Sequence, residues 1–173
     1  ESYSKTGRMM PEDGLEQLKA FDSILLGAVG YPGVPDHVSL WGLLIPIRRG
    51  FDQYVNLRPV RLFEGVPCPL VNREGKPRKP GEIDFLVVRE NTEGEYTNLG
   101  GVMYAGTERE IVLQETVMSR FGTDRVLKFA FEQAAARPRK KLDVATKSNG
   151  IAISMPWWDG RADAMHQHYP QIA

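Results

Sequence analysis

Apolar residues at helical spacing are the clearest pattern in the second half of the chain. Between Arg120 and Arg137, apolar residues stand at positions 126, 127, 130, 131 and 134, which is the spacing of one face of an amphipathic helix. Pro138 follows and ends this helix, because proline removes a backbone donor and clashes with the preceding turn. Residues 151–168 have a mostly helical pattern as well. The pattern therefore predicts two helices in this half.

Two shorter helices are predicted in the first half. Residues 11–20 favour one, with Asp13 as a possible cap at its start. Ser39–Gly50 is apolar at helical spacing, but Pro46 must either kink this helix or begin a new turn. The sequence between them, GYPGVPD at 30–36, is rich in turn residues and predicts a loop.

Five stretches have the composition of strands: Phe21–Val29, Tyr54–Leu62, Ile83–Val88, Arg109–Thr116 and Leu142–Ala145. The first and third are continuous apolar runs, which is typical of strands buried on both faces. Pro59 cannot donate a ladder hydrogen bond and so marks an edge strand or a bulge. Residues 66–82, rich in Pro, Gly, Lys and Arg, form an exposed loop in this interpretation.

Strands that alternate with helices predict an α/β fold with a parallel or mixed sheet. A length of 173 residues is enough for one ordinary domain or for pieces of two. The chain begins at Glu1 without a methionine, and it ends directly after a helical pattern. We therefore expect it to be a segment of a longer protein, incomplete at both ends.

Composition narrows the possible functions. Twenty-two basic residues balance twenty-two acidic ones, which gives no electrostatic case for nucleic acid or for an anionic membrane as a partner. Cys68 is the single cysteine, so a reducing, cytoplasmic setting fits best. No apolar run approaches the roughly 20 residues of a membrane-spanning helix.

Three arginines give the strongest chemical signal. Arg48, Arg58 and Arg89 each lie beside an apolar stretch, and each can grip a carboxylate through a planar fork of donors. Clustered guanidinium groups repel one another unless an anion lies among them, so together they predict a site for a di- or tricarboxylate. Taken singly, each arginine is better interpreted as a solvated arginine on the surface.

Two further residues could carry proton chemistry. Tyr96 lies seven residues beyond Arg89, and cations around a tyrosine stabilise its ionised form, so that its hydroxyl can act as an acid. Lys147 follows a predicted strand, at the position where parallel sheets place ligand groups, and could act as a base. The alternatives are a tyrosine of the core or rim and an ordinary loop lysine.

Three other patterns carry less weight. The glycines at 27, 30 and 33 do not match the dinucleotide fingerprint, because a proline-containing loop follows them instead of a helix. The histidines at 37, 166 and 168 lack partners at the spacing of metal ligands. Asp159 and Asp163 are four residues apart on a predicted helix, where a solvated face is the better interpretation.

The motifs as a set resemble the metal-dependent, β-decarboxylating dehydrogenases that act on isocitrate, isopropylmalate, D-malate and tartrate. The resemblance covers essentially the whole chain and rests on LLGAVG at 25–30, IRRGFDQYVNLRPVR at 47–61, VVRENTEGEY at 87–96 and TKSNG at 146–150. PDHVSLWGLL at 35–44 together with DQYVNLRP is similar to the D-malate/tartrate branch. The resemblance implies the isopropylmalate dehydrogenase-like fold, a mixed parallel and antiparallel sheet with flanking helices.

The resemblance also implies a role for each candidate residue. Arg48, Arg58 and Arg89 match the clamp on the substrate carboxylates, and Tyr96 matches the acid that protonates the enol after carbon dioxide leaves. Lys147 matches a lysine supplied to the active site of the partner subunit of a homodimer. Asn149 matches a neighbour of that lysine that reaches the partner's substrate or nicotinamide. Residues 1–56 would belong to a partial cofactor-side domain, and 57–173 to a partial domain for substrate and dimerisation.

The implied reaction is oxidation of a (2R)-hydroxy dicarboxylate by NAD, followed by loss of carbon dioxide, with Mn²⁺ or Mg²⁺ polarising the intermediate ketone. The family's metal-binding aspartates and most of its cofactor site are expected outside these 173 residues, so the isolated chain should be inactive. Two alternatives are isopropylmalate dehydrogenase and a noncatalytic, carboxylate-binding regulatory subunit of the same family.

Overall fold

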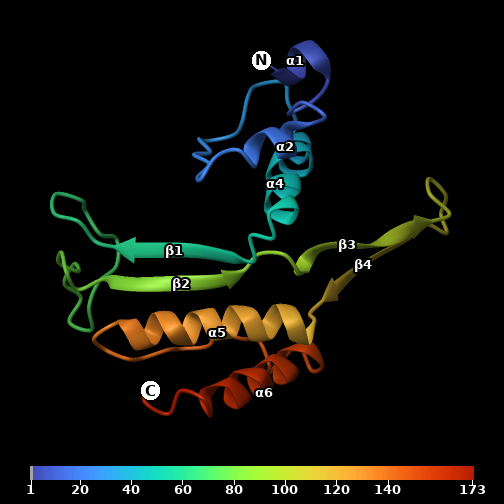
Figure 1. Ribbon diagram of the computed structural model, residues 1–173. Helices are drawn as coiled ribbons and strands as arrows, with labels where there is room; N and C mark the ends of the chain where they lie inside the picture. The colour runs from blue at the N-terminus through green and yellow to red at the C-terminus, as the bar shows by residue number, and fades with distance from the viewer. Residues whose placement is uncertain (1) are drawn as a thin grey trace. The chain divides into compact units, whose positions relative to one another are not determined.

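The computed structural model describes residues 2–173 and divides the chain into two compact units (Figure 1). The first unit ends at Tyr54 and the second comprises Val55–Ala173. Each unit is described below by itself, and the cofactor and substrate roles of the two parts stay predictions. In the described part of the chain, no helix is long and apolar enough to cross a membrane.

The first unit is helical wherever it has regular structure. Its elements are α1 (Ser2–Thr6), α2 (Gly14–Leu18), α3 (Asp36–Ser39), the π-helical turn η1 (Leu40–Leu44) and α4 (Ile45–Gly50). Pro46 is the second residue of α4, directly after η1, and the winding of the helical run changes from π to α at this point, where a residue without an N–H is accommodated. Asp13 precedes α2 as predicted, but its carboxylate accepts from Gln17 Nε2 at 3.0 Å and caps no backbone N–H.

Two predicted strands are wrong. Residues 21–30 have no regular secondary structure, and the Leu25 side chain is fully exposed. Residues 142–145 are irregular as well, although Leu142 N donates to the carbonyl oxygen of Ala173 at 2.9 Å. A strand exists only when a neighbour completes its backbone hydrogen bonds, and neither segment has a pairing strand among the residues described.

A two-stranded antiparallel sheet opens the second unit. It pairs β1 (Val55–Arg61) with β2 (Asp84–Glu90), and the long loop between them is the exposed one predicted. Pro59 lies on β1, which is an edge strand, as predicted. The prediction that β2 is buried on both faces is wrong. Helix α5 covers only one face, so Phe85 and Val87 on the other face remain exposed (Figure 1).

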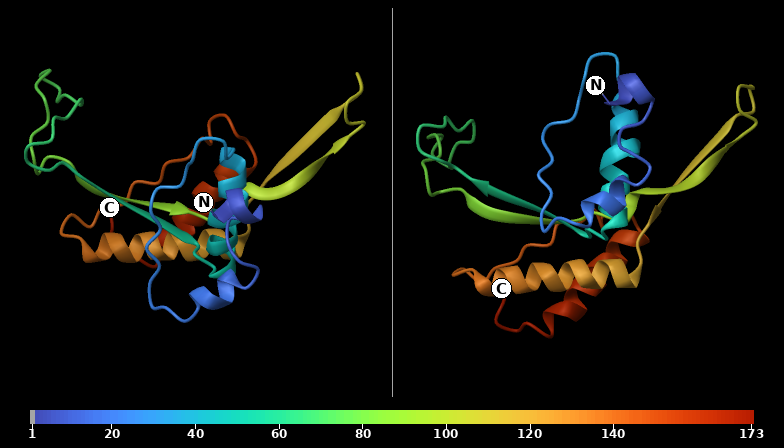
Figure 2. Two further views of the ribbon diagram at one scale, coloured as in Figure 1. Left: turned by 90° about the horizontal axis from the view of Figure 1, so that it is seen from above. Right: turned by 45° about the horizontal axis from the view of Figure 1, so that its top comes forward.

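The second sheet is a hairpin of β3 (Gly94–Met103) and β4 (Ile111–Val117), which projects away from β1, β2 and α5 (Figures 1 and 2). The strand β4 was predicted but β3 was not. Gly100 is an uncommon residue for a strand interior, but β3 requires a glycine at this position. Its φ is +146°, and a Cβ there would lie 2.0 Å from the Leu113 carbonyl oxygen, so the two strands approach closely only because it is glycine. Both described sheets are antiparallel.

Helices α5 (Arg120–Ala136) and α6 (Ser154–His166) pack against each other and form most of the core of the second unit. The apolar face predicted for α5 is confirmed, because its members are all buried: Val126, Leu127, Ala130, Phe131 and Ala134. Ser119 Oγ caps α5 by accepting from Gly122 N at 3.0 Å. At its other end, Pro138 forces Arg137 into an extended conformation, with φ −91° and ψ 147°.

Two ion pairs fix α5 to its neighbours. Arg137 Nη2 donates to Asp84 Oδ1 at 2.6 Å, which ties the end of α5 to the start of β2. Arg161 on α6 donates from Nε and Nη2 to the two oxygens of Asp124 on α5, both at 2.7 Å. The hydrogen bond from Arg161 is the main cause that lowers the pKa of Asp124 below its ordinary value of 3.8.

This pair makes a pH-dependent contribution to stability. Because the folded-state pKa of Asp124 is depressed, the contribution is present above pH 3.8 and is lost as the pH falls through the folded value. We expect Asp124→Asn to lower the free energy of unfolding at pH 7 by about 1–3 kcal/mol. Urea denaturation at a series of pH values should show that the difference in unfolding free energy between Asp124→Asn and wild type becomes smaller as the pH is lowered from neutrality through the range in which an ordinary aspartate titrates.

The control for this prediction is Glu132→Gln, which removes the exposed ion pair of Glu132 with Lys128 on α5. Exposed pairs of this kind contribute about 0–1 kcal/mol, so the control should remain near wild type at every pH. A gap between Asp124→Asn and wild type that does not change with pH would contradict the assignment.

Candidate functional site

The exposed face of the β1–β2 sheet brings two of the predicted arginines together. In the antiparallel register Arg58 lies opposite Val87, and Asn56 lies opposite Arg89. Residues opposite one another share a face, and so do residues two apart on one strand, so Arg58 and Arg89 are diagonal neighbours on the same face. Both side chains are exposed, on the face that α5 leaves uncovered.

Tyr96 joins this pair from the next strand. The Arg89 guanidinium carbon lies 5.5 Å from the centroid of the Tyr96 ring, which is within the range of a cation–π contact. The residue keeps 41% of its surface exposed, so it is a rim residue that a ligand can reach and not a core residue. The structure thus places a cation and a potential proton donor side by side.

An amide that the sequence reasoning missed completes the group. Asn56 Oδ1 accepts a hydrogen bond from Arg58 Nε at 3.0 Å and so orients its guanidinium group. Asn56 Nδ2 donates to Asn91 Oδ1 at 3.4 Å, which links β1 to the turn after β2. A signal was available, because Asn56 is two residues before Arg58 in a predicted strand and therefore shares its face.

The other three predicted residues belong to other elements of the chain. Arg48 is half-buried on α4 in the first unit, whereas Arg58, Arg89 and Tyr96 belong to the second. Lys147 and Asn149 are exposed in a turn that follows residue 146, where Gly150 N and Ile151 N donate to the Lys147 carbonyl oxygen, both at 2.9 Å. This turn follows the irregular segment 142–145 and is not part of the β1–β2 sheet. The structure therefore joins three of the six predicted site residues.

The Glu90 carboxylate closes the turn between Arg89 and Tyr96. The Glu90 carboxylate accepts from the backbone N–H of Thr92 at 2.9 Å and of Glu93 at 2.7 Å, and also from the Thr92 hydroxyl. These bonds close the chain into a tight turn directly after Arg89. A hint was present in the acidic stretch that begins at the residue after Arg89, but acid-to-amide pairing within a turn has no unique sequence pattern.

The described residues do not supply a metal site. Within residues 2–173 the structure gathers no three side chains of His, Cys, Asp or Glu that could hold a metal ion. For a nicotinamide cofactor, the predicted contact Asn149 is exposed on its turn, and an amide there is able to donate and accept hydrogen bonds.

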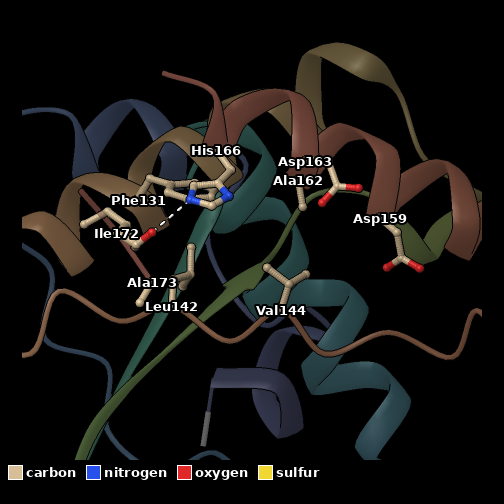
Figure 3. Close-up of a pocket in the computed structure, with 9 residues that line it drawn as sticks. All are labelled: Phe131, Leu142, Val144, Asp159, Ala162, Asp163, His166, Ile172 and Ala173. Carbon is tan, nitrogen blue, oxygen red and sulfur yellow. Dashed lines mark hydrogen bonds between the residues drawn. The ribbon is translucent and has the colours of Figure 1, made fainter. Parts of the chain in front are cut away.

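A cavity of about 270 Å³ lies between α5, α6 and the last residues of the second unit (Figure 3). None of the predicted site residues lines it. Two of its polar side chains are engaged, because Thr146 Oγ1 donates to Asp159 Oδ1 at 2.7 Å and His166 Nε2 lies 2.8 Å from the Ile172 carbonyl oxygen. Two carboxylates and an apolar wall do not fit an anionic substrate, so we do not assign the substrate to it.

Comparison with known proteins decides the family. The model of the isocitrate/isopropylmalate dehydrogenase family matches residues 1–173. The chain belongs to this family. The predicted resemblance, including that to the D-malate/tartrate branch, is confirmed by relatives that match nearly the whole chain.

Two of those relatives are bacterial enzymes. The chain is 62% identical over 173 residues to the decarboxylating D-malate dehydrogenase of Escherichia coli K12. It is 60% identical over 172 residues to the tartrate dehydrogenase/decarboxylase of Pseudomonas putida. Each match covers 99% of this chain but only 46% of the relative, so this family member spans about half the length of the curated relatives it matches.

Solved structures confirm the predicted fold. The chain superposes on isocitrate dehydrogenase from Methylococcus capsulatus with a TM-score of 0.73 at 23% identity, covering 99% of this chain and 47% of that one. It also superposes on the TT0538 protein from Thermus thermophilus with a TM-score of 0.69 at 29% identity, covering 99% of this chain and 32% of that one. The α/β class and the family fold are therefore confirmed, although both described sheets of this chain are antiparallel.

Proposed function

We propose that the complete protein catalyses the NAD-dependent oxidative decarboxylation of a (2R)-hydroxy dicarboxylate, either D-malate to pyruvate and carbon dioxide or the oxidation of tartrate. The observation that carries this proposal is the exposed group of Arg58, Arg89 and Tyr96 in a chain 60–62% identical to D-malate and tartrate dehydrogenases. This group offers two cations for a dianion and one hydroxyl for proton transfer.

Substrate binding rests on the arginines. Arg58 and Arg89 are on one face of one sheet, so their guanidinium groups can contact the two ends of a small dicarboxylate, or share one end. Asn56 holds the Arg58 fork in place through its 3.0 Å hydrogen bond, which lowers the entropy lost on binding. Arg48 is proposed to join them in the complete enzyme.

Proton transfer is assigned to Tyr96 and Lys147. In the proposed role, the Tyr96 hydroxyl gives its proton to the carbon from which carbon dioxide has left. The Arg89 cation over its ring stabilises the negative charge that develops on the phenol oxygen. Lys147 receives the proton of the substrate hydroxyl, directly or through water, in the active site of the partner subunit.

A homodimer is part of the proposal, and the β3–β4 hairpin supports it. Four apolar side chains share one face of the hairpin by its register, and each keeps more than half of its surface exposed: Leu99, Met103, Ile111 and Leu113. A projecting pair of strands with such a face is stable only when a partner covers it. We assign that place to a second copy of this chain.

We propose that the complete protein requires NAD and a divalent Mn²⁺ or Mg²⁺ ion, with metal ligands from residues outside this chain. Asn149 is proposed to contact NAD or the substrate of the partner subunit, and bound NAD would supply the hydride acceptor for the oxidation. A cytoplasmic location belongs to the same proposal, because a single half-buried cysteine suits a reducing compartment.

The experiment is a turnover panel of the complete protein with D-malate, tartrate, isopropylmalate and isocitrate, each with NAD and with Mn²⁺ or Mg²⁺. We expect kcat/KM to be highest for D-malate or tartrate. A preference for isopropylmalate would favour the isopropylmalate dehydrogenase alternative. Binding of dicarboxylates without any turnover would favour a noncatalytic regulatory subunit.

A further inference from the structure

Glu93 lies in the short turn between β2 and β3, so Arg89 precedes it and Tyr96 follows it. It is half-buried, although an isolated carboxylate on a turn would normally be solvated. None of the roles proposed above uses it. Its contacts show why it is held inward.

The Glu93 carboxylate binds the beginning of α5. Its Oε2 accepts from the backbone N–H of Ser119 at 2.7 Å, and its Oε1 accepts from the Ser119 hydroxyl at 2.6 Å. The same hydroxyl oxygen accepts from Gly122 N at 3.0 Å, so one chain of hydrogen bonds runs from the turn into the helix. Charged acceptors at a helix N-terminus are favoured by the helix dipole, which strengthens this contact.

Gly122 makes room for this contact. A Cβ atom at position 122 would lie 2.6 Å from Glu93 Cδ and Oε2 and 2.7 Å from Oε1, so a side chain there would displace the Glu93 carboxylate from this position. Gly122 is buried in the first turn of α5, where its backbone is helical and glycine has no conformational advantage. Its small size is therefore needed because the Glu93 carboxylate occupies the space beside it.

A second contact ties the same turn to the same helix. Arg125 Nη2, one turn further along α5, donates to Thr92 Oγ1 at 3.1 Å. Helix α5 is itself fixed by the Arg137–Asp84 and Asp124–Arg161 pairs. The turn that carries Arg89 and Tyr96 at its two ends is thus attached to the most extensively buried helix of the second unit.

We infer that Glu93 is a positioning residue, which holds Arg89 and Tyr96 in register for the substrate by anchoring the turn between them to the N-terminus of α5, with Gly122 as its required partner. This inference rests on the proposed function, because the register matters only if both side chains act on one substrate. Without the Glu93 contact, the Arg125–Thr92 hydrogen bond alone holds the turn to α5, and the distance between the Arg89 guanidinium and the Tyr96 hydroxyl is less tightly fixed.

The test compares Gly122→Ala and Glu93→Gln in the complete protein. Gly122→Ala keeps the carboxylate but displaces it, and Glu93→Gln keeps the size but replaces one acceptor oxygen with a donor that faces the Ser119 donors. We expect each to lower kcat for the preferred dicarboxylate by about 10- to 100-fold, as a misplacement near 1 Å does, while KM for NAD stays unchanged. Amide hydrogen exchange at Ser119 and across 94–97 should become faster.

Two matched controls and a double variant separate positioning from general damage. Gly160→Ala changes a helical glycine of α6 where a Cβ meets no atom within 4 Å, and Glu95→Gln changes an exposed glutamate on the face of β3 opposite to Tyr96. Both should keep wild-type kcat. In a Tyr96→Phe background, Gly122→Ala should add much less loss than it causes alone, because both act on one step.

Wild-type kcat in both test variants, or fully additive losses with Tyr96→Phe, would overturn the inference. If the wild-type protein turns over none of the hydroxy dicarboxylates, the proposed function fails, and hydrogen exchange then decides about the anchor alone. Faster exchange at 94–97 in Gly122→Ala but not in Gly160→Ala supports the anchor, and equal exchange in the two refutes it.

Discussion

Replacement of Arg89 with lysine is expected to lower kcat/KM for the preferred hydroxy dicarboxylate by about 100-fold. Lysine keeps the positive charge but offers a point charge in place of a planar fork, so it cannot hold a carboxylate through two parallel hydrogen bonds. It also gives up part of the contact with Tyr96, because a guanidinium plane stacks on a ring and an ammonium does not. Steady-state kinetics on the complete protein measure both effects.

Arg109 provides a matched control within the same unit. Its guanidinium carbon lies 5.0 Å from the centroid of the Tyr104 ring, so Arg109→Lys alters an arginine–tyrosine contact of the same kind away from the β1–β2 face. This variant should retain wild-type kcat/KM and thermal stability. Equal losses in Arg89→Lys and Arg109→Lys would remove Arg89 from the substrate clamp.

The second large effect is expected when subunits are mixed. If Lys147 serves the site of the partner subunit, Lys147→Ala and Arg89→Ala homodimers are each inactive for different reasons. After dissociation and reassociation, half of the dimers are mixed, and each mixed dimer contains one site with both native residues. Activity should therefore return to about a quarter of the wild-type value, as expected for random pairing in a twofold dimer.

Two measurements make this result decisive. Size-exclusion chromatography of the mixture confirms that dimers have re-formed, and mixing Lys147→Ala with itself under the same treatment gives the background. Recovery to about a quarter supports subunit sharing. Re-formed mixed dimers without activity would show that Lys147 and Arg89 must come from the same chain, whereas activity in either homodimer alone would show that its replaced residue is not needed.

The two long helices of the second unit could be predicted from the sequence because their signals are local, whereas α1 was not predicted. The apolar positions from Val126 to Ala134 define the buried face of α5, and Pro138 defines its end. The predicted strands at 21–29 and 142–145 fail because pairing depends on segments distant in sequence, which an apolar run does not specify. The strand β3 was not predicted, because its glycines interrupt the sequence pattern of a strand and its pairing with β4 is irregular.

The site could be predicted only in part, for a related reason. The residue types indicate an anion site, and family motifs point to Arg58, Arg89 and Tyr96. The register that puts Arg58 beside Arg89 is a property of two strands together, so neither strand's sequence contains it. The Glu93–Ser119 anchor joins residues 26 positions apart, and it becomes visible only when α5 lies against the turn.

The Arg89–Tyr96 contact also bears on how the protein assembles during folding. The two residues are only seven positions apart, and a closed loop of that length loses little chain entropy compared with contacts between distant segments. The turn between them can therefore form early. Arg58 can join them only after the long loop that ends at residue 83 has closed and β1 has paired with β2. Tyr96, the proposed acid, and Arg89 would then be in place early, and Arg58 would join them when β1 pairs with β2.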